Sequence, residues 1–123
     1  MSRWLQVYNR TQGGPPLLKA RWCASFGCRL RGLTFRRNLP GNEGLLLVES
    51  RESVTATGIH MMAVFMELGV AWLDSEYNVV DVVCAKPWRM YLPAAPARYI
   101  LEGTPALLER VRVGDQLELV DEA

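Results

Sequence analysis

The chain has 123 residues, half of them hydrophobic, and a formal net charge of +1. This length predicts one domain, residues 1–123, that buries a core without a metal or disulfides. The uncharged run 58–66 in the hydrophobic middle of the chain is shorter than the roughly 20 residues that cross a bilayer. No secretory signal pattern is visible at 1–8, and the three cysteines form no Cys-x-x-Cys pair. We therefore expect a soluble cytoplasmic protein with free thiols and no membrane association.

A β-hairpin is predicted at the start of the chain. Residues 4–8 and 17–23 are predicted strands, and the segment 9–16 between them is rich in turn residues. Its glycines permit positive φ angles, and its two prolines cannot donate to a strand ladder. Two strands with such a connection are typical of a hairpin.

A short helix is predicted next. Ser25 is a typical helix N-cap. Phe26, Leu30 and Leu33 follow the i, i+4, i+7 spacing of one apolar stripe. The helix is predicted to lie within 26–38 and to be short, because two glycines in this segment weaken it.

The middle of the chain predicts further strands. Residues 44–49 are a predicted buried strand, and the polar segment 50–56 is a predicted surface loop. The stretch 57–74 is nearly uncharged and contains the single histidine. Its β-branched and aromatic residues favour strands over a helix. We expect two strands, 57–62 and 67–73, that form a hairpin with a bend between them.

The last third of the chain predicts strands at 79–85, 97–102 and 116–120. The prolines of 92–96 exclude a central strand there. Thr104 and Pro105 suit the start of a helical turn over 106–110, and Gly114 suits a turn that needs a positive φ. Together, these segments predict a mainly β (α+β) fold: a compact, barrel- or sandwich-like sheet with one or two short helices.

Charge is distributed unevenly. The first forty residues carry eight basic and no acidic side chains, whereas the rest carry six basic and thirteen acidic ones. In one interpretation, arginines of 29–37 pair with acids such as Glu43, Asp81 and Glu102. In the other, these arginines bind an anion such as a nucleic acid. The near-zero net charge argues against a nucleic acid, so pairing is the favoured interpretation, above all for Arg31.

Five segments of the chain form a recognisable series. They are RLRGLTFR at 29–36, GNEGLLLV at 41–48, KPWR at 86–89, YILEG at 99–103 and VGDQLEL at 113–119. In order and spacing they resemble the domain-of-unknown-function family numbered 192, over nearly the whole chain. The resemblance implies a compact, mainly β single domain. It implies no substrate, because the family has no established activity.

The central stretch departs from the pattern of that family. Family members typically read F-W-M-K-N-T-x-x-P-L-D where this chain reads I-H-M-M-A-V-F-M-E-L-G at 59–69. The Lys-Asn-Thr cluster is replaced by Met62, Ala63 and Val64. Any family function that depends on those polar groups is therefore expected to be missing here.

Candidate chemistry centres on His60. Together with Glu67 or a cysteine, it could serve a hydrolase-like site, but no motif ties these residues together. The Cys and His spacing of a zinc site is absent, and the methionines of this stretch fit core packing better than a Cu(I) site. No glycine-rich phosphate loop is present. We therefore expect neither a metal nor a cofactor.

The favoured hypothesis is a non-catalytic domain that binds a small ligand or a protein partner. The expected binding surface surrounds His60, Trp88, Arg89 and the 92–96 loop, because Trp and Arg are frequent binding anchors. The alternatives are a small hydrolase-like enzyme that uses His60, and an anion- or nucleic-acid-binding module that uses 29–37. The sequence indicates neither an oligomeric state nor any catalytic residue. The predicted binding residues are Arg31, Arg36, His60, Glu67, Trp88 and Arg89.

Overall fold

The computed structural model describes residues 3–33 and 36–122, without the side chains of Phe26, Leu30 and Arg31. Seven of the nine described strands form one sheet with the order β6-β5-β8-β3-β2-β1-β9, and two short strands, β4 and β7, pair separately. The strands are β1 (Trp4–Asn9), β2 (Leu18–Cys23), β3 (Glu43–Ser53), β4 (Ile59–His60), β5 (Leu68–Leu73), β6 (Val79–Ala85), β7 (Met90–Tyr91), β8 (Ala97–Gly103) and β9 (Leu117–Asp121). The helices are α1 (Phe26–Arg31) and the 3-10 helix η1 (Pro105–Glu109). The predicted mainly β fold is confirmed.

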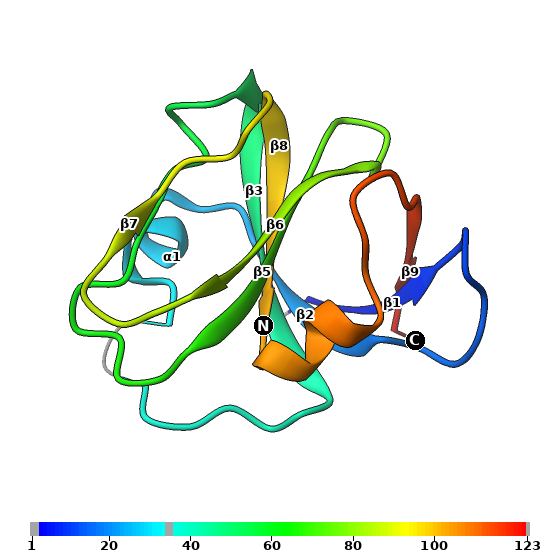
Figure 1. Cartoon of the computed structure of the whole chain (residues 1–123), viewed down its shortest axis with the longest axis horizontal. Coiled ribbons are helices and arrows are strands. Elements are labelled where there is room, and N and C mark those ends of the chain that lie inside the picture. The colour runs from blue at the N-terminus through cyan, green and yellow to red at the C-terminus, as the bar shows by residue number, and fades with distance from the viewer. Residues whose placement is uncertain (1–2, 34–35, 123) are drawn as a thin grey trace.

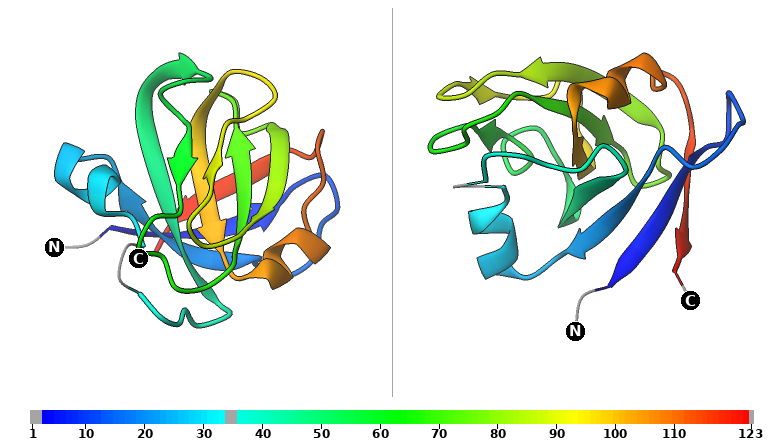
Figure 2. Two further views of the ribbon diagram at one scale, coloured as in Figure 1. Left: turned by 60° about the vertical axis from the view of Figure 1, so that its left-hand side comes forward. Right: turned by 90° about the horizontal axis from the view of Figure 1, so that it is seen from below.

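The main sheet curls into a half-barrel (Figure 1). Its strand pairs are antiparallel except for β2 and β3, which are parallel and joined through α1. The first strand lies between β2 and the last strand, with Leu5 opposite Asp121. A single bridge between Asn78 and Gln116 links the start of β6 to the segment before β9. The two ends of the sheet therefore approach each other (Figure 2), and the start of β1 lies beside the end of β9, where the Glu122 N–H donates to the Trp4 carbonyl oxygen at 3.0 Å.

Side chains of the main sheet alternate between two apolar clusters. All seven strands contribute to the first cluster, which includes Val7, Leu46 and Leu101 and fills the inside of the curl. The second cluster, which includes Leu47 and Trp72, lies on the opposite face of β2, β3, β5, β6 and β8. This second face is the one on which the candidate site is built.

A second layer covers that opposite face. It consists of α1, the β4–β7 pair and the loops beside them, which lie together on one side of the central strands (Figure 1). Ile59, Met61 and Val64 from this layer pack into the second cluster. The buried indole of Trp72 in β5 donates a hydrogen bond of 2.7 Å to the carbonyl oxygen of Thr57, which fixes the layer on the sheet.

Several local predictions are confirmed. The Ser25 hydroxyl accepts a hydrogen bond of 3.2 Å from the Cys28 N–H and caps α1. Thr104 and Pro105 begin the short helix η1, although the Thr104 side chain makes no capping hydrogen bond. Gly114 has a φ of 97°, a conformation that costs most other residues strain.

Two predictions about the middle of the chain are wrong. The segments 57–62 and 67–73 do not form a hairpin, because β4 pairs with β7, whereas β5 pairs with β6 and β8. The predicted loop 50–56 belongs in part to β3, which continues to Ser53. The outer end of β3 still pairs with β8, through Ser53 and Ala97, after a register shift. The side chains of 50–52 are exposed and polar, which is why this segment resembles a loop in the sequence.

Candidate functional site

A narrow cleft lies between α1 and the β4 layer, above the second face of the sheet. Its volume is about 70 Å³, and Arg29, Leu33, Ile59, His60 and Glu102 are among the residues that line it. Leu47 of β3 and Leu68 of β5 form apolar parts of its wall. The cleft thus combines an apolar wall with one carboxyl, one guanidinium and one imidazole group.

Glu102 is the most unusual group in this cleft. It lies in β8 between β3 and β5, opposite Leu45 and Val70, and is only 5% exposed. Burial raises the pKa of its carboxyl group from 4.5 to about 7. Among the described side chains, which do not include that of Arg31, none donates a hydrogen bond to this carboxyl group and no cation pairs with it. A buried polar group without a partner is costly to stability and commonly marks a functional position.

Arg29 reaches the cleft from α1. Its guanidinium group forms an ion pair with Glu49 at the end of the buried part of β3, and it lies 3.5 Å from the carbonyl oxygen of Val48. Its Nε atom is buried and has no hydrogen-bond partner within the described part of the chain. Arg29 therefore forms one wall of the cleft. Its charge is already compensated by Glu49.

A wider groove adjoins the cleft. Its volume is about 460 Å³, and Gly58, Ile59 and His60 line both hollows. The rest of the groove is lined by Met90 and Tyr91 of β7, by Leu92, the residue after β7, and by Thr55. Groove volumes of this size are typical of sites for small molecules.

Large apolar side chains are exposed around this groove. Met90 is 78% exposed and Leu92 is 61% exposed. Nearby, Trp88 is 62% exposed and contacts the ring of Phe65 edge-on, with 6.3 Å between the ring centroids. Trp88 has a φ of 66°, and its N–H donates to the Met61 carbonyl oxygen at 2.8 Å. A non-glycine residue held in this conformation while its side chain faces solvent is a feature found at binding sites.

The structure brings together three of the six predicted binding residues. His60 pairs with Met90 in the β4–β7 ladder. The Met61 N–H donates to the carbonyl oxygen of Arg89, and Trp88 donates back to Met61. His60, Trp88 and Arg89 therefore lie on the same small layer, although only His60 lines the cleft and the groove.

The other three predicted residues lie elsewhere or outside the description. Arg36 is exposed beyond α1 and lines neither hollow. Glu67 is also exposed and accepts a hydrogen bond of 3.4 Å from the Cys84 thiol. The predicted pairing of Arg31 falls on a side chain outside the described part of the structure.

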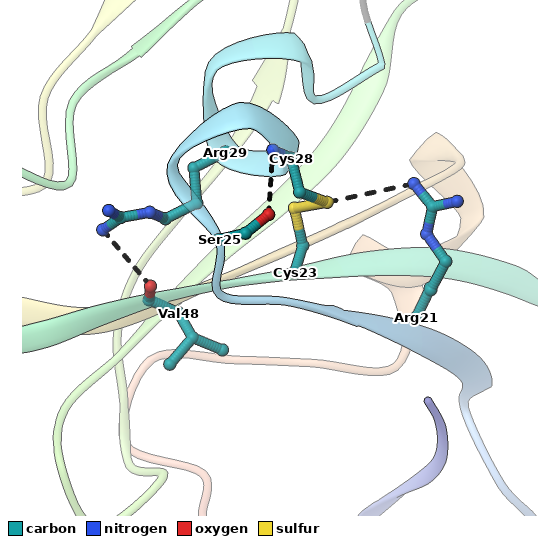
Figure 3. The surroundings of a disulfide bond; sticks show 6 residues. All are labelled: Arg21, Cys23, Ser25, Cys28, Arg29 and Val48. Atoms are coloured by element: carbon teal, nitrogen blue, oxygen red, sulfur yellow. Dashed lines mark hydrogen bonds between the residues drawn. A yellow bond between two sulfur atoms is a disulfide. The ribbon is translucent and has the colours of Figure 1, made fainter. Parts of the chain in front are cut away.

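The expectation of free thiols is wrong for two of the three cysteines. Cys23 and Cys28 form a disulfide that links the end of β2 to α1 (Figure 3). Arg21 lies 4.0 Å from the Cys28 sulfur, on the side of the disulfide away from Arg29 (Figure 3).

The third cysteine, Cys84, is free. Burial, and to a smaller extent the hydrogen bond to Glu67, raises the pKa of its thiol. A raised pKa makes a thiol a poorer nucleophile at neutral pH. The cytoplasmic location remains a prediction.

The predicted ion pair between Asp81 and an arginine of 29–37 is not found among the described side chains. The Asp81 carboxylate accepts hydrogen bonds from the backbone N–H groups of Val82, at 2.8 Å, and Ala94, at 2.9 Å. These two donors satisfy Asp81 without an arginine. In the described chain, Arg29 pairs with Glu49 instead. Packing of the two layers places Glu49, not Asp81, beside α1.

Sequence reasoning missed the main features of the site. The place of Glu102 in the apolar run Ile100–Leu101–Glu102–Gly103 was the signal for a buried acid. Its predicted pairing with an arginine stays a prediction for Arg31, whose side chain lies outside the described part of the structure. Met90 and Leu92 alternate with Tyr91, and this alternation could have suggested a short exposed strand. None of these local signals shows that β7 would pair with β4.

Comparison with known proteins places the chain in a family. The family model of DUF192, described as an uncharacterized ACR, matches residues 7–119. A UPF0127 protein of Pyrococcus furiosus is 36% identical over 114 residues, which cover 91% of this chain and 96% of that protein. A UPF0127 protein of Thermococcus kodakarensis is 36% identical over 107 residues, which cover 87% of this chain and 67% of that protein.

A solved structure has the same fold. A Sinorhizobium meliloti 1021 protein, named a "putative transcription regulator", superposes with a TM-score of 0.83 at 19% identity, covering 97% of this chain and 94% of that one. At this identity the likeness concerns the fold alone. In the described residues, no helix is long and apolar enough to cross a membrane. From the family match over residues 7–119 and the relatives at 36% identity, the chain is a member of the DUF192 family of uncharacterised UPF0127 proteins.

Proposed function

We propose that this protein is a small-ligand-binding domain whose ligand lies in the groove beside β7, with one end in the cleft. The observation that carries this proposal is the shared border of the two hollows at Gly58, Ile59 and His60. The groove provides an apolar surface, and the cleft provides the buried carboxyl group of Glu102, which has no partner among the described side chains. Small-molecule sites commonly combine an apolar cavity with a few polar groups that orient the ligand.

A binding role fits the site better than hydrolysis. His60 makes no hydrogen bond to a nucleophile in the described part of the chain. Cys23 and Cys28 are joined to each other, and neither Glu67 nor Cys84 lines the cleft. A hydrolase of the kind considered from the sequence needs the base and the nucleophile within hydrogen-bond reach.

Anion binding through the arginine segment has less support. Arg29 is already paired with Glu49. Arg37 lies with its guanidinium carbon 4.9 Å from the centroid of the Phe65 ring, so its side chain covers an apolar surface. Arg36 is exposed, but it lines neither hollow. These contacts account for two of the arginines without an anionic partner.

The test uses a neutral apolar fluorophore, N-phenyl-1-naphthylamine, and two matched variants. Leu92 lies in the groove and is 61% exposed, whereas Val113 lies outside both hollows and is 59% exposed. We expect Leu92→Ser to weaken fluorophore binding by about tenfold, the effect of losing one large apolar contact. Val113→Ser should bind like the wild type.

Both side chains are exposed, so the urea midpoint of each variant should stay close to that of the wild type. Equal fluorophore affinity in Leu92→Ser, Val113→Ser and the wild type would show that the groove is not the binding site. Absence of binding to the wild type would equally count against the proposal.

A further inference from the structure

The carboxyl group of Glu102 points from the sheet toward the cleft. Along β8, Ile100 and Glu102 share one face, because side chains alternate along a strand. Ile100 belongs to the second apolar cluster, on the face that the cleft overlies. Glu102 lines the cleft itself, and so does the solvent-exposed His60. A ligand that fills the cleft therefore meets this carboxyl group.

The surroundings of Glu102 provide apolar contacts but no compensating charge. On the strands beside it, Leu45 and Val70 lie opposite Glu102. Among the described side chains, the other ionisable groups that line the cleft are Arg29 from α1, which is paired with Glu49 of β3, and His60 from β4, which is exposed. Burial is the one cause that shifts the pKa of Glu102, so neither Arg29 nor His60 compensates its charge.

We propose that Glu102 is the head-group subsite of this hollow and that it takes a primary amine, or a similar cationic hydrogen-bond donor, carried on an apolar body. This inference rests on the proposed ligand-binding function and adds the chemical class of the ligand. A cation that donates hydrogen bonds supplies the positive charge and the hydrogen-bond donors that the described neighbours of the carboxylate do not provide. An anionic head group would be repelled by Glu102 when it is ionised, and an apolar one would leave the carboxyl group unpaired.

The size of the two hollows limits the shape of the ligand. The cleft, at about 70 Å³, admits only a few heavy atoms, such as an aminomethyl group. The groove, at about 460 Å³, has room for a larger apolar body against Met90 and Leu92. His60 lies at the border between them and is placed to contact the ligand where its head group meets its body.

Binding of an amine should be linked to the protonation of Glu102. Its pKa of about 7 means that the carboxyl group is largely neutral below this pH. An alkylammonium ion favours the ionised form, so it should lower this pKa and release a proton when it binds near pH 6. The affinity for an amine should therefore rise as the pH rises.

The experiment compares three ligands of equal chain length, hexylamine, 1-hexanol and hexanoate, by calorimetry and by amide chemical shifts at pH 5.5 and pH 8. We expect hexylamine to bind about tenfold more tightly than 1-hexanol at pH 8, as for a charge-assisted hydrogen bond. This preference should be lost at pH 5.5. Hexanoate should bind most weakly at pH 8.

Two variants assign the effect to one carboxyl group. Glu102→Gln should bind hexylamine and 1-hexanol equally, whereas Glu67→Gln, an exposed acid outside the cleft, should keep the wild-type preference. If Glu102→Gln does not fold, proton release by the wild type provides a second readout. It is measured by calorimetry at pH 6 in two buffers of different ionisation enthalpy.

The possible outcomes separate the two proposals. Shifts of groove amides with 1-hexanol but no preference for hexylamine would overturn the head-group inference and leave the ligand-binding function standing. An unchanged amine preference in Glu102→Gln, or no proton release by the wild type, would likewise overturn the inference. If none of the three ligands affects the groove, both proposals fail.

Discussion

At the scale of single residues, the fold tolerates one ionisable group in a place where most acids would be paired. Glu102 is held between two central strands by backbone pairing with Leu45 and Val70, not by its own side chain. Asp115 is the contrast. Burial opposes its ionisation, but hydrogen bonds from Asn9, the Arg112 N–H and Gln12 outweigh burial and lower its pKa. The two buried acids thus have opposite pKa shifts, because described groups donate hydrogen bonds to Asp115, whereas burial is the cause that acts on Glu102.

The raised pKa of Glu102 predicts how the stability of the protein depends on pH. Between pH 4.5 and 7, the unfolded chain releases a proton that the folded protein keeps. The free energy of unfolding should therefore fall as the pH rises through this window, by on the order of 3 kcal/mol from this residue. Glu102→Gln, which stays neutral, should lack this contribution and be more stable than the wild type at pH 8.

Urea denaturation of both proteins at several pH values from 4.5 to 8 checks this prediction. The difference between the two proteins isolates Glu102, because all other groups titrate alike in both. A wild type and a Glu102→Gln variant with parallel stability profiles would contradict it.

At the scale of elements, α1 depends on bonds to its neighbours. A helix of six residues is too short to be stable alone. It is held by the disulfide between Cys23 and Cys28, by the Ser25 cap and by the ion pair of Arg29 with Glu49. Because Arg29 lines the cleft, these bonds also set the position of one wall of the candidate site.

Reduction of the disulfide should therefore destabilise the protein. The bond closes a loop between residues only five positions apart, so the expected loss is at the low end for disulfides, about 2 kcal/mol. Dithiothreitol should lower the urea midpoint of the wild type and of Cys84→Ser alike. It should have no effect on the urea midpoint of the double variant Cys23→Ser, Cys28→Ser. A wild-type midpoint that is the same with and without dithiothreitol would refute the prediction.

The elements also show where sequence reasoning works and where it stops. The first hairpin, the Ser25 cap and the Gly114 turn were predictable, because turn chemistry and capping act between residues close in the chain. The partner of β4 was not, because Ile59 pairs with Tyr91 from a distant segment, and two-residue strands carry no period. The candidate site lies in this non-local layer. His60 and Trp88 were therefore predicted individually, whereas the groove between β4 and β7 was not.

At the scale of the whole molecule, the two layers differ in how firmly they are held. All six residues of β5 are buried, and this strand is hydrogen-bonded to β6 on one side and to β8 on the other. By contrast, β4 and β7 have two residues each and pair only with each other. Ligand sites are commonly built on the less stable parts of a fold.

This contrast predicts two classes of amide hydrogen exchange. Amides of β5 and β8 should exchange only through global unfolding, and their exchange should accelerate steeply with added denaturant. Amides of β4 and β7 should exchange faster, through local opening, with little dependence on denaturant. Exchange measured by NMR at low denaturant concentrations checks this, and uniform protection across both layers would contradict it.

The pairing of β1 with β9 has a consequence for the nascent chain. Leu5 and Val7 are buried only when β9, residues 117–121, has been added to the sheet. At ordinary rates of translation, roughly 5–20 s separate the synthesis of these two strands. During this time, the first hairpin has an unpaired edge and uncovered apolar side chains, which is the condition that chaperones recognise. The order of strands in the finished sheet thus makes β1, which is synthesised before the other eight described strands, wait for β9 before both of its edges are paired.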